Sequence, residues 1–171
     1  MKNLLVLFGG VSPEHEVSLR SAEFVLGHID QSKYNVYAVG ITKEGKWKYY
    51  PSQDYAAIRE NHWQEAEGVC DAALSPARGQ GLLILKPQGL EIVPMDCCFP
   101  VLHGENGEDG SIQGLMQVAG VPCVGPGVTA SASCMDKTMT KLVVGDVDRA
   151  KAFYEAVCGV REARRINAGP E

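Results

Sequence analysis

Apolar runs alternate with helix-forming stretches along the first three quarters of the chain. Residues 4–8 form a continuous apolar run that ends at Gly9-Gly10, and from Glu14 onward the apolar residues recur at helical spacing. A continuous apolar run is typical of a strand covered on both faces, whereas residues three and four apart share one face of a helix. The same pattern predicts strands at 34–41, 97–102 and 121–124, helices at 14–29, 111–119 and 129–144, and hairpin turns at 43–46 and 86–89. It assigns no definite secondary structure to residues 51–80.

Strands that alternate with helices predict an open, mostly parallel α/β sheet with helices on both faces. The chain changes character at Gly145. Asp146 is a favourable N-cap and apolar residues between 153 and 160 fall at helical spacing, whereas residues 161–171 are polar. We therefore expect one domain over residues 1–144, followed by a divergent C-terminal helix and tail over residues 145–171.

Charge and composition narrow the class of protein. The net charge is −5 and no cluster of lysine and arginine stands out, which argues against a nucleic-acid or anionic-membrane partner. No apolar run approaches the roughly 20 residues of a membrane-spanning helix. The six cysteines include no Cys-x-x-Cys pair, and the N-terminus has no export signal. We expect reduced, buried thiols and a cytoplasmic protein.

The first candidate site is the segment Phe-Gly-Gly-Val-Ser-Pro-Glu-His-Glu-Val-Ser at residues 8–18. It lies between a strand and a helix, where open α/β sheets bind ligands. It does not have the Gly-x-Gly-x-x-Gly spacing of a dinucleotide loop. Glu14 opens the helix, so its carboxylate is placed either to contact a ligand or only to stabilise the helix dipole, with Ser12 as a cap.

The second candidate site is His-Gly-Glu-Asn-Gly-Glu-Asp-Gly-Ser-Ile-Gln-Gly at residues 103–114. It follows a buried strand and opens a helix, whose free N–H groups suit an anion. His103 stands where it can donate a hydrogen bond to a phosphate or carboxylate; the alternative is a turn with solvated acids. Glu108 and Asp109 are expected to shape the loop, and no metal site is assigned. A third segment of interest lies at residues 131–141. Its Lys137 is either a solvated surface residue or a contact for a phosphate group.

The third segment is Ser-Ala-Ser-Cys-Met-Asp-Lys-Thr-Met-Thr-Lys at residues 131–141. Together, the three segments resemble the D-alanine–D-alanine ligase family. The resemblance extends over roughly residues 2–144. Two features, the hairpin that contains Trp47 and the long insertion at 50–95, are most similar to the branch of the family that includes the D-alanine–D-serine ligases of vancomycin resistance. The resemblance implies a Rossmann-like pre-ATP-grasp domain, the N-terminal part of a three-domain enzyme that commonly dimerises through this domain.

The resemblance also implies an activity. Such ligases use ATP and Mg²⁺ to phosphorylate the carboxylate of one D-alanine, and the amine of a second D-alanine attacks the acyl phosphate. The dipeptide enters peptidoglycan synthesis in the bacterial cytoplasm. Glu14 matches the residue that anchors the ammonium of the first D-alanine, with Val17 and Ser18 lining that subsite. His103 matches the histidine near the carboxylate and the transferred phosphate, and Lys137 matches a lysine that contacts the ATP phosphates.

The resemblance ends after Lys141, where the family continues into the ATP-grasp domains that supply most of the nucleotide pocket and the metal carboxylates. Residues 142–157 are instead similar to the first strand and helix of the vicinal-oxygen-chelate (glyoxalase-like) family. Two hypotheses remain open. The chain is either the substrate-binding part of a ligase that is inactive alone, or a non-catalytic binding module or subunit for a separate ATP-grasp partner. The choice among D-alanine, D-serine and D-lactate as second substrate belongs to the absent domains.

Overall fold

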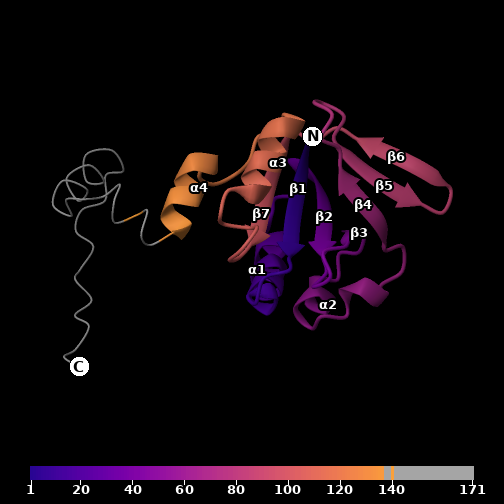
Figure 1. Cartoon of the computed structure of the whole chain (residues 1–171). Coiled ribbons are helices and arrows are strands. Elements are labelled where there is room, and N and C mark those ends of the chain that lie inside the picture. Colours follow the sequence, from indigo (N-terminus) through magenta and orange to yellow (C-terminus); the bar gives the residue numbers. More distant parts are fainter. Residues whose placement is uncertain (137–139, 141–171) are drawn as a thin grey trace, which may run out of the picture. The chain divides into compact units, whose positions relative to one another are not determined.

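One seven-stranded sheet, in the order β6-β5-β4-β3-β2-β1-β7, organises the described part of the chain (Figure 1). The computed structural model describes residues 1–136 and residue 140, and Met1–Met135 form one compact unit. The strands are β1 (Lys2–Gly9), β2 (Tyr34–Ile41), β3 (Trp47–Tyr50), β4 (Cys70–Leu74), β5 (Leu82–Lys86), β6 (Gly89–Val93) and β7 (Cys97–Leu102). The helices are α1 (His15–His28), α2 (Tyr55–Arg59), the 3-10 turn η1 (Trp63–Glu65), α3 (Ser111–Ala119) and α4 (Val128–Met135).

The sheet is mixed, so the expectation of a mostly parallel sheet is wrong. Strand β1 pairs in parallel with β2 and with β7, but the pairs from β2 through β6 are all antiparallel. The physical reason lies in the connections. Parallel neighbours need a crossover, which α1 provides between β1 and β2, whereas antiparallel neighbours can be joined by short turns, as β2 and β3 and also β5 and β6 are. The longer connection between the antiparallel strands β3 and β4 contains α2 and η1. The turn before β3 is closed by a hydrogen bond from Thr42 N to Lys46 O (2.9 Å).

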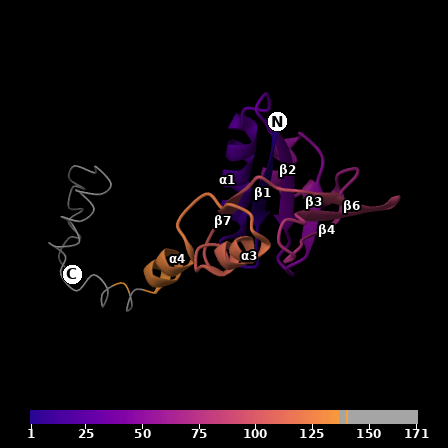
Figure 2. The same ribbon diagram turned by 90° about the horizontal axis from the view of Figure 1, so that it is seen from above.

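Helices cover both faces of the parallel part of the sheet, as predicted, with α1 and α3 on opposite sides of β1 (Figure 2). Alternate residues of β1 belong to the two cores. Leu4, Val6 and Phe8 pack with residues of α1, whereas Leu5 and Leu7 pack with residues of α3. This two-sided burial explains why the strand has a continuous apolar sequence instead of an alternating one.

The register of the parallel strands places both candidate loops at one edge of the sheet. Gly9, the last residue of β1, pairs with Ile41 of β2 and with Leu102 of β7. The segment that begins at Gly10 and the segment that begins at His103 therefore leave adjacent strands at the same level. Residues 90 or more positions apart in the sequence are brought together by this pairing alone.

Other predicted elements differ in extent. The predicted strand at 121–124 is a single parallel bridge between Cys98 and Cys123. The predicted helix at 129–144 is described as α4 over Val128–Met135. The proposed domain boundary at 144/145 and the C-terminal helix lie outside the described residues, so they stay predictions. In the part of the chain that the structure describes, no helix combines the length and apolar character needed to cross a lipid bilayer.

Candidate functional site

The first loop turns sharply at Gly9 and Gly10, which have φ values of +85° and +101°. A Cβ atom on Gly9 would stand 2.2 Å from the carbonyl oxygen of Ile41. Glycine is therefore required where β1 ends. The turn is fixed by a hydrogen bond from Gly10 N to Ile41 O (2.9 Å) and by the contact between His15 Nδ1 and Gly10 O (2.6 Å). The turn places Glu14 at the start of α1.

The second loop is shaped by its own carboxylates. Glu108 Oε2 accepts a hydrogen bond from Gly104 N (2.8 Å), and Asp109 accepts hydrogen bonds from Asn106 N (2.8 Å) and Ser111 N (2.9 Å). Burial opposes ionisation of Asp109, but the backbone N–H donors outweigh it and lower the pKa of its carboxyl group below the usual value. These contacts agree with the loop-shaping roles predicted for Glu108 and Asp109.

Ser12 and Ser21 join the two loops. Ser12 Oγ donates a hydrogen bond to the backbone oxygen of His103 (2.7 Å) and accepts one from Glu14 N (3.1 Å). Ser21 Oγ, on α1, lies 3.1 Å from His103 Nε2. The backbone and the imidazole of His103 are thus both tied to the segment that carries Glu14.

Glu14, His103 and Glu108 converge at the edge of the sheet. One ligand atom from each of the three side chains lies within 4.8 Å of the others, and both carboxylates are exposed while His103 is partly buried. Within residues 1–136 and 140, no other three histidine, cysteine or carboxylate side chains come so close. Two carboxylates beside an imidazole form a local site for a cation.

The separations are compatible with an ammonium group. Two atoms bound to one zinc ion at about 2.1 Å can be at most about 4.2 Å apart. Two acceptors of hydrogen bonds from one ammonium nitrogen at about 2.8 Å can be about 5.6 Å apart. A spread of up to 4.8 Å lies between these limits. A spacing of up to 4.8 Å accommodates an ammonium nitrogen without movement of the side chains, whereas zinc requires every pair of ligand atoms to lie within about 4.2 Å.

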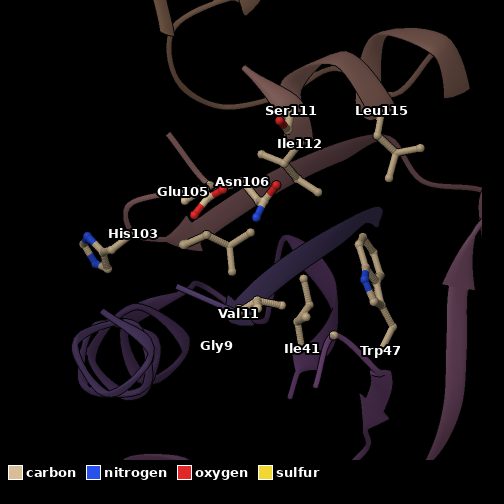
Figure 3. A pocket seen from close by; sticks show the side chains of 14 residues that line it. Gly9, Val11, Ile41, Trp47, His103, Glu105, Asn106, Ser111, Ile112 and Leu115 are labelled. Atoms are coloured by element: carbon tan, nitrogen blue, oxygen red, sulfur yellow. The ribbon is translucent and has the colours of Figure 1, made fainter. Parts of the chain in front are cut away.

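A cavity of about 370 Å³ adjoins this group at His103, whereas Glu14 and Glu108 are not among the residues that line it (Figure 3). His103 borders it on the side nearest α1, and Trp47 and Leu115 lie on the opposite side. Glu105, Asn106 and Ser111 add polar atoms to the rim. The apolar part of the lining consists of Val11, Ile41, Trp47, Leu102, Ile112 and Leu115. A cavity with an apolar wall and a few convergent polar groups is the usual form of a small-molecule site.

The other residues expected at the site lie elsewhere. Ser18 is fully buried, and its hydroxyl group accepts a hydrogen bond from Gly9 N (2.8 Å) and donates one to Val101 O. Ser18 therefore fastens α1 to β1 and β7. The side chain of Val17 is 46% exposed, and neither residue lines the cavity. Their contact with a ligand stays a prediction. Lys137 lies outside the described residues.

Sequence reasoning missed the linking roles of Ser12 and Ser21 and the place of Trp47 in the cavity wall. No local signal identifies them, because their partners are far away along the chain. Ser12 is 91 residues from His103, and Ser21 is 82 residues from it. Only the pairing of β1 with β7 makes these contacts possible.

Comparison with known proteins identifies the family to which this chain belongs. A family model described as "D-ala D-ala ligase N-terminus" matches residues 3–126, which include both loops. The chain belongs to the D-alanine–D-alanine ligase family. Curated ligases named D-alanine–D-alanine ligase from Thermoanaerobacter sp. strain X514 and from Clostridium novyi are each 44% identical to it, over 142 and 159 residues.

The matches cover only part of each ligase. The chain is covered to 83% and 91% in these two comparisons, but it spans 39% and 42% of the relatives' own length. The VanG D-Ala:D-Ser ligase from Enterococcus faecalis has a TM-score of 0.77 at 35% identity, with 91% of this chain and 49% of that chain covered. The D-alanine–D-alanine ligase from Coxiella burnetii has a TM-score of 0.73 at 30% identity, with 88% and 42% covered. The chain corresponds to the N-terminal domain of these ligases.

Proposed function

We propose that this domain binds the first D-alanine of an ATP-dependent D-alanine–D-alanine ligase reaction. The observation that carries the proposal is the convergence of the Glu14 and His103 side chains at the ends of β1 and β7. A D-amino acid is a zwitterion, with an ammonium and a carboxylate group a few ångströms apart. An acid beside an imidazole offers one partner to each end.

The proposed roles follow from charge. The carboxylate of Glu14 accepts hydrogen bonds from the ammonium group of D-alanine, a charge-assisted contact that is stronger than a neutral one. His103 donates a ring N–H to the carboxylate that becomes phosphorylated. Glu108 adds negative charge on the ammonium side while its Oε2 atom remains bonded to Gly104 N. The two loops thus orient one amino acid by both of its charged ends.

In the complete reaction, one carboxylate oxygen of D-alanine attacks the γ-phosphorus of ATP and ADP leaves. The amine of the second substrate then attacks the acyl carbon, inorganic phosphate leaves, and the amine loses a proton. A free carboxylate is a poor electrophile, so its conversion to an acyl phosphate makes the second step feasible. The role of this domain is to hold the first carboxylate in position for phosphoryl transfer.

Mg²⁺ is proposed for the whole ligase, where it would neutralise charge on the transferred phosphoryl group. The group Glu14, His103 and Glu108 does not suit it, because Mg²⁺ requires near-octahedral oxygen ligands at about 2.1 Å. We therefore route no step through a metal at these residues. Contact between Lys137 and the ATP phosphates remains part of the proposal. The reaction would supply a peptidoglycan precursor in the cytoplasm, where ATP is available, and the domain is proposed to form a homodimer.

The alternative is a non-catalytic binding subunit that docks onto a separate ATP-grasp partner. The chain spans about two fifths of the length of the curated relatives it matches. The second substrate, D-alanine, D-serine or D-lactate, is assigned by neither proposal, because we assign that choice to the ATP-grasp part.

An ADP-release assay with D-alanine, ATP and Mg²⁺ tests both proposals. The chain alone should release no ADP above a no-enzyme control, and release should appear when an ATP-grasp segment from a related ligase is added in trans or fused to residue 136. Turnover by the chain alone would contradict its proposed role as a binding part. Activity of the fusion but not of the mixture supports the ligase domain, and activity of the mixture supports the docking subunit.

A further inference from the structure

Two cysteines stand opposite each other at the edge of the sheet beside β7. Cys98 of β7 is paired in parallel register with Cys123, which follows α3. The pairing is bracketed by hydrogen bonds from Cys98 N to Pro122 O and from Val124 N to Cys98 O, both 2.8 Å. Because two backbone bonds fix the register, the two residues are held directly side by side.

This register suits a disulfide. Adjacent strands lie about 4.8 Å apart, within the range of about 4.4–6.8 Å over which Cα atoms are bridged. Paired residues of neighbouring strands point to the same face of a sheet. Cys98 is fully buried in the core on the α3 side, and Cys123 packs against that same core while remaining partly exposed.

The neighbouring Cys97 has the opposite orientation. It packs against the core on the α1 side, as the alternation of side chains along β7 requires. Cys97 is therefore an internal control, since it has the same chemistry and is one residue from Cys98, but faces away from Cys123.

The two thiols also differ in ionisation. The hydrogen bond from the Cys98 thiol lowers the pKa of Cys123, whereas that contact and burial raise the pKa of Cys98. The partly exposed sulfur is thus the better nucleophile, and the buried thiol lies next to it.

We propose that Cys98 and Cys123 form a redox-sensitive dithiol that closes to an intramolecular disulfide on exposure to a hydroperoxide. The Cys123 thiolate attacks one peroxide oxygen, which forms a sulfenic acid and releases hydroxide. The sulfur of Cys98 then attacks the Cys123 sulfur, forms the S–S bond and expels the hydroxyl group, which leaves as water with the Cys98 proton. The sum is two thiols and one hydrogen peroxide giving one disulfide and two water molecules.

The bond would close a loop that contains the second candidate loop and α3. Cross-linking restricts the unfolded chain, so the oxidised protein should melt several degrees higher than the reduced one. The switch is independent of the proposed substrate, because Cys98 lies at the opposite end of β7 from His103.

The test treats the reduced 171-residue chain with graded hydrogen peroxide, blocks free thiols with N-ethylmaleimide and cleaves after glutamate. Cleavage separates residues 92–105, which contain Cys97 and Cys98, from residues 109–155, which contain Cys123 and Cys134. The expected product is a cross-link between these two peptides, lighter than their sum by two hydrogen atoms and lost on treatment with dithiothreitol.

Variants assign the bond. The cross-link should persist in C97S, in C134S and in the double variant C97S/C134S, where Cys98 and Cys123 are the only cysteines in the two peptides. It should be lost in C123S, which changes a partly exposed side chain and is expected to fold. Absence of the cross-link from the folded double variant, or its survival in C123S, would overturn the proposal.

Discussion

The hydroxyl group of Ser12 donates a hydrogen bond to the backbone oxygen of His103 at 2.7 Å. The bond joins two loops that are 91 residues apart in sequence. Because the hydroxyl oxygen of Ser12 also accepts a hydrogen bond from Glu14 N, one small side chain holds the proposed acid and the proposed imidazole beside each other. The strands bring the two loops to the same edge of the sheet, and the hydrogen bonds of Ser12 fix the position of one loop relative to the other.

Replacing Ser12 with alanine should therefore weaken the fold as well as the site. Ser12 is 5% exposed and makes two hydrogen bonds, each contributing about 1 kcal/mol. We expect S12A to lower the free energy of unfolding by about 2 kcal/mol. Urea denaturation measures this. The matched control is S21A, which removes only the contact with the imidazole; an equal loss in the two variants would contradict the joining role of Ser12.

Glu14 should control the affinity for the first D-alanine. The removal of a charged partner from a bound ammonium group costs about 2–4 kcal/mol, which is roughly a 30- to 700-fold rise in KM. The measurement uses a chimaera in which residues 1–136 replace the matching part of the Thermoanaerobacter ligase, with and without E14Q.

Glu16 provides the control for this prediction. It lies on the same helical turn, but its carboxylate accepts a hydrogen bond from Lys43, which lowers the pKa of Glu16. E16Q should change KM for D-alanine by less than about threefold, as expected for an exposed ion pair. Equal KM values for E14Q and the parent chimaera would remove Glu14 from the site.

Two glycine substitutions should have opposite effects on stability. In G9A the new Cβ atom meets Ile41 O at 2.2 Å, with φ at +85°, so we expect a loss of more than about 2 kcal/mol or a failure to fold. Gly27 is in α1 with nothing within 4 Å of the added atom, so G27A should stabilise by about 0.5–1 kcal/mol. Thermal melting of both variants checks the pair, and a G9A protein as stable as the wild type would contradict the described turn.

Asp109 should make the second loop sensitive to acid. The pKa of its carboxyl group is lower in the folded state than the unfolded value of about 3.9. Its stabilising contribution is therefore complete above that unfolded value and disappears as the pH falls through the folded pKa. D109N should be less stable than the wild type by about 1 kcal/mol at neutral pH, because the side chain is partly exposed, and nearly equal to it near pH 2. A constant difference across this range would rule out the carboxylate as the cause.

Local patterns predicted the elements that carry the site. The continuous apolar sequence of β1 indicated burial on both faces, and the polar segments after β1 and β7 indicated adjacent loops. In the antiparallel half of the sheet, the predicted hairpin turns at 43–46 and 86–89 are confirmed between β2 and β3 and between β5 and β6. The pairing of β4 with β3 and β5 was not predicted, because these strands are only four or five residues long and β4 lies in a stretch without a clear pattern. The position of Ser18 is also informative. The family resemblance implies a place beside the ligand, whereas the hydroxyl group of Ser18 is bonded to Gly9 N and Val101 O in the interior.

One amino acid is proposed to bind between the two loops, and NMR titration of the ¹⁵N-labelled chain with D-alanine tests this most directly. We predict saturable shifts of the amide signals in both residues 10–18 and residues 103–111, weaker shifts with L-alanine, and loss of the D-alanine response in E14Q but not in E16Q. Shifts confined to one loop, or the same response to D-alanine in E14Q as in the wild type, would contradict the claim.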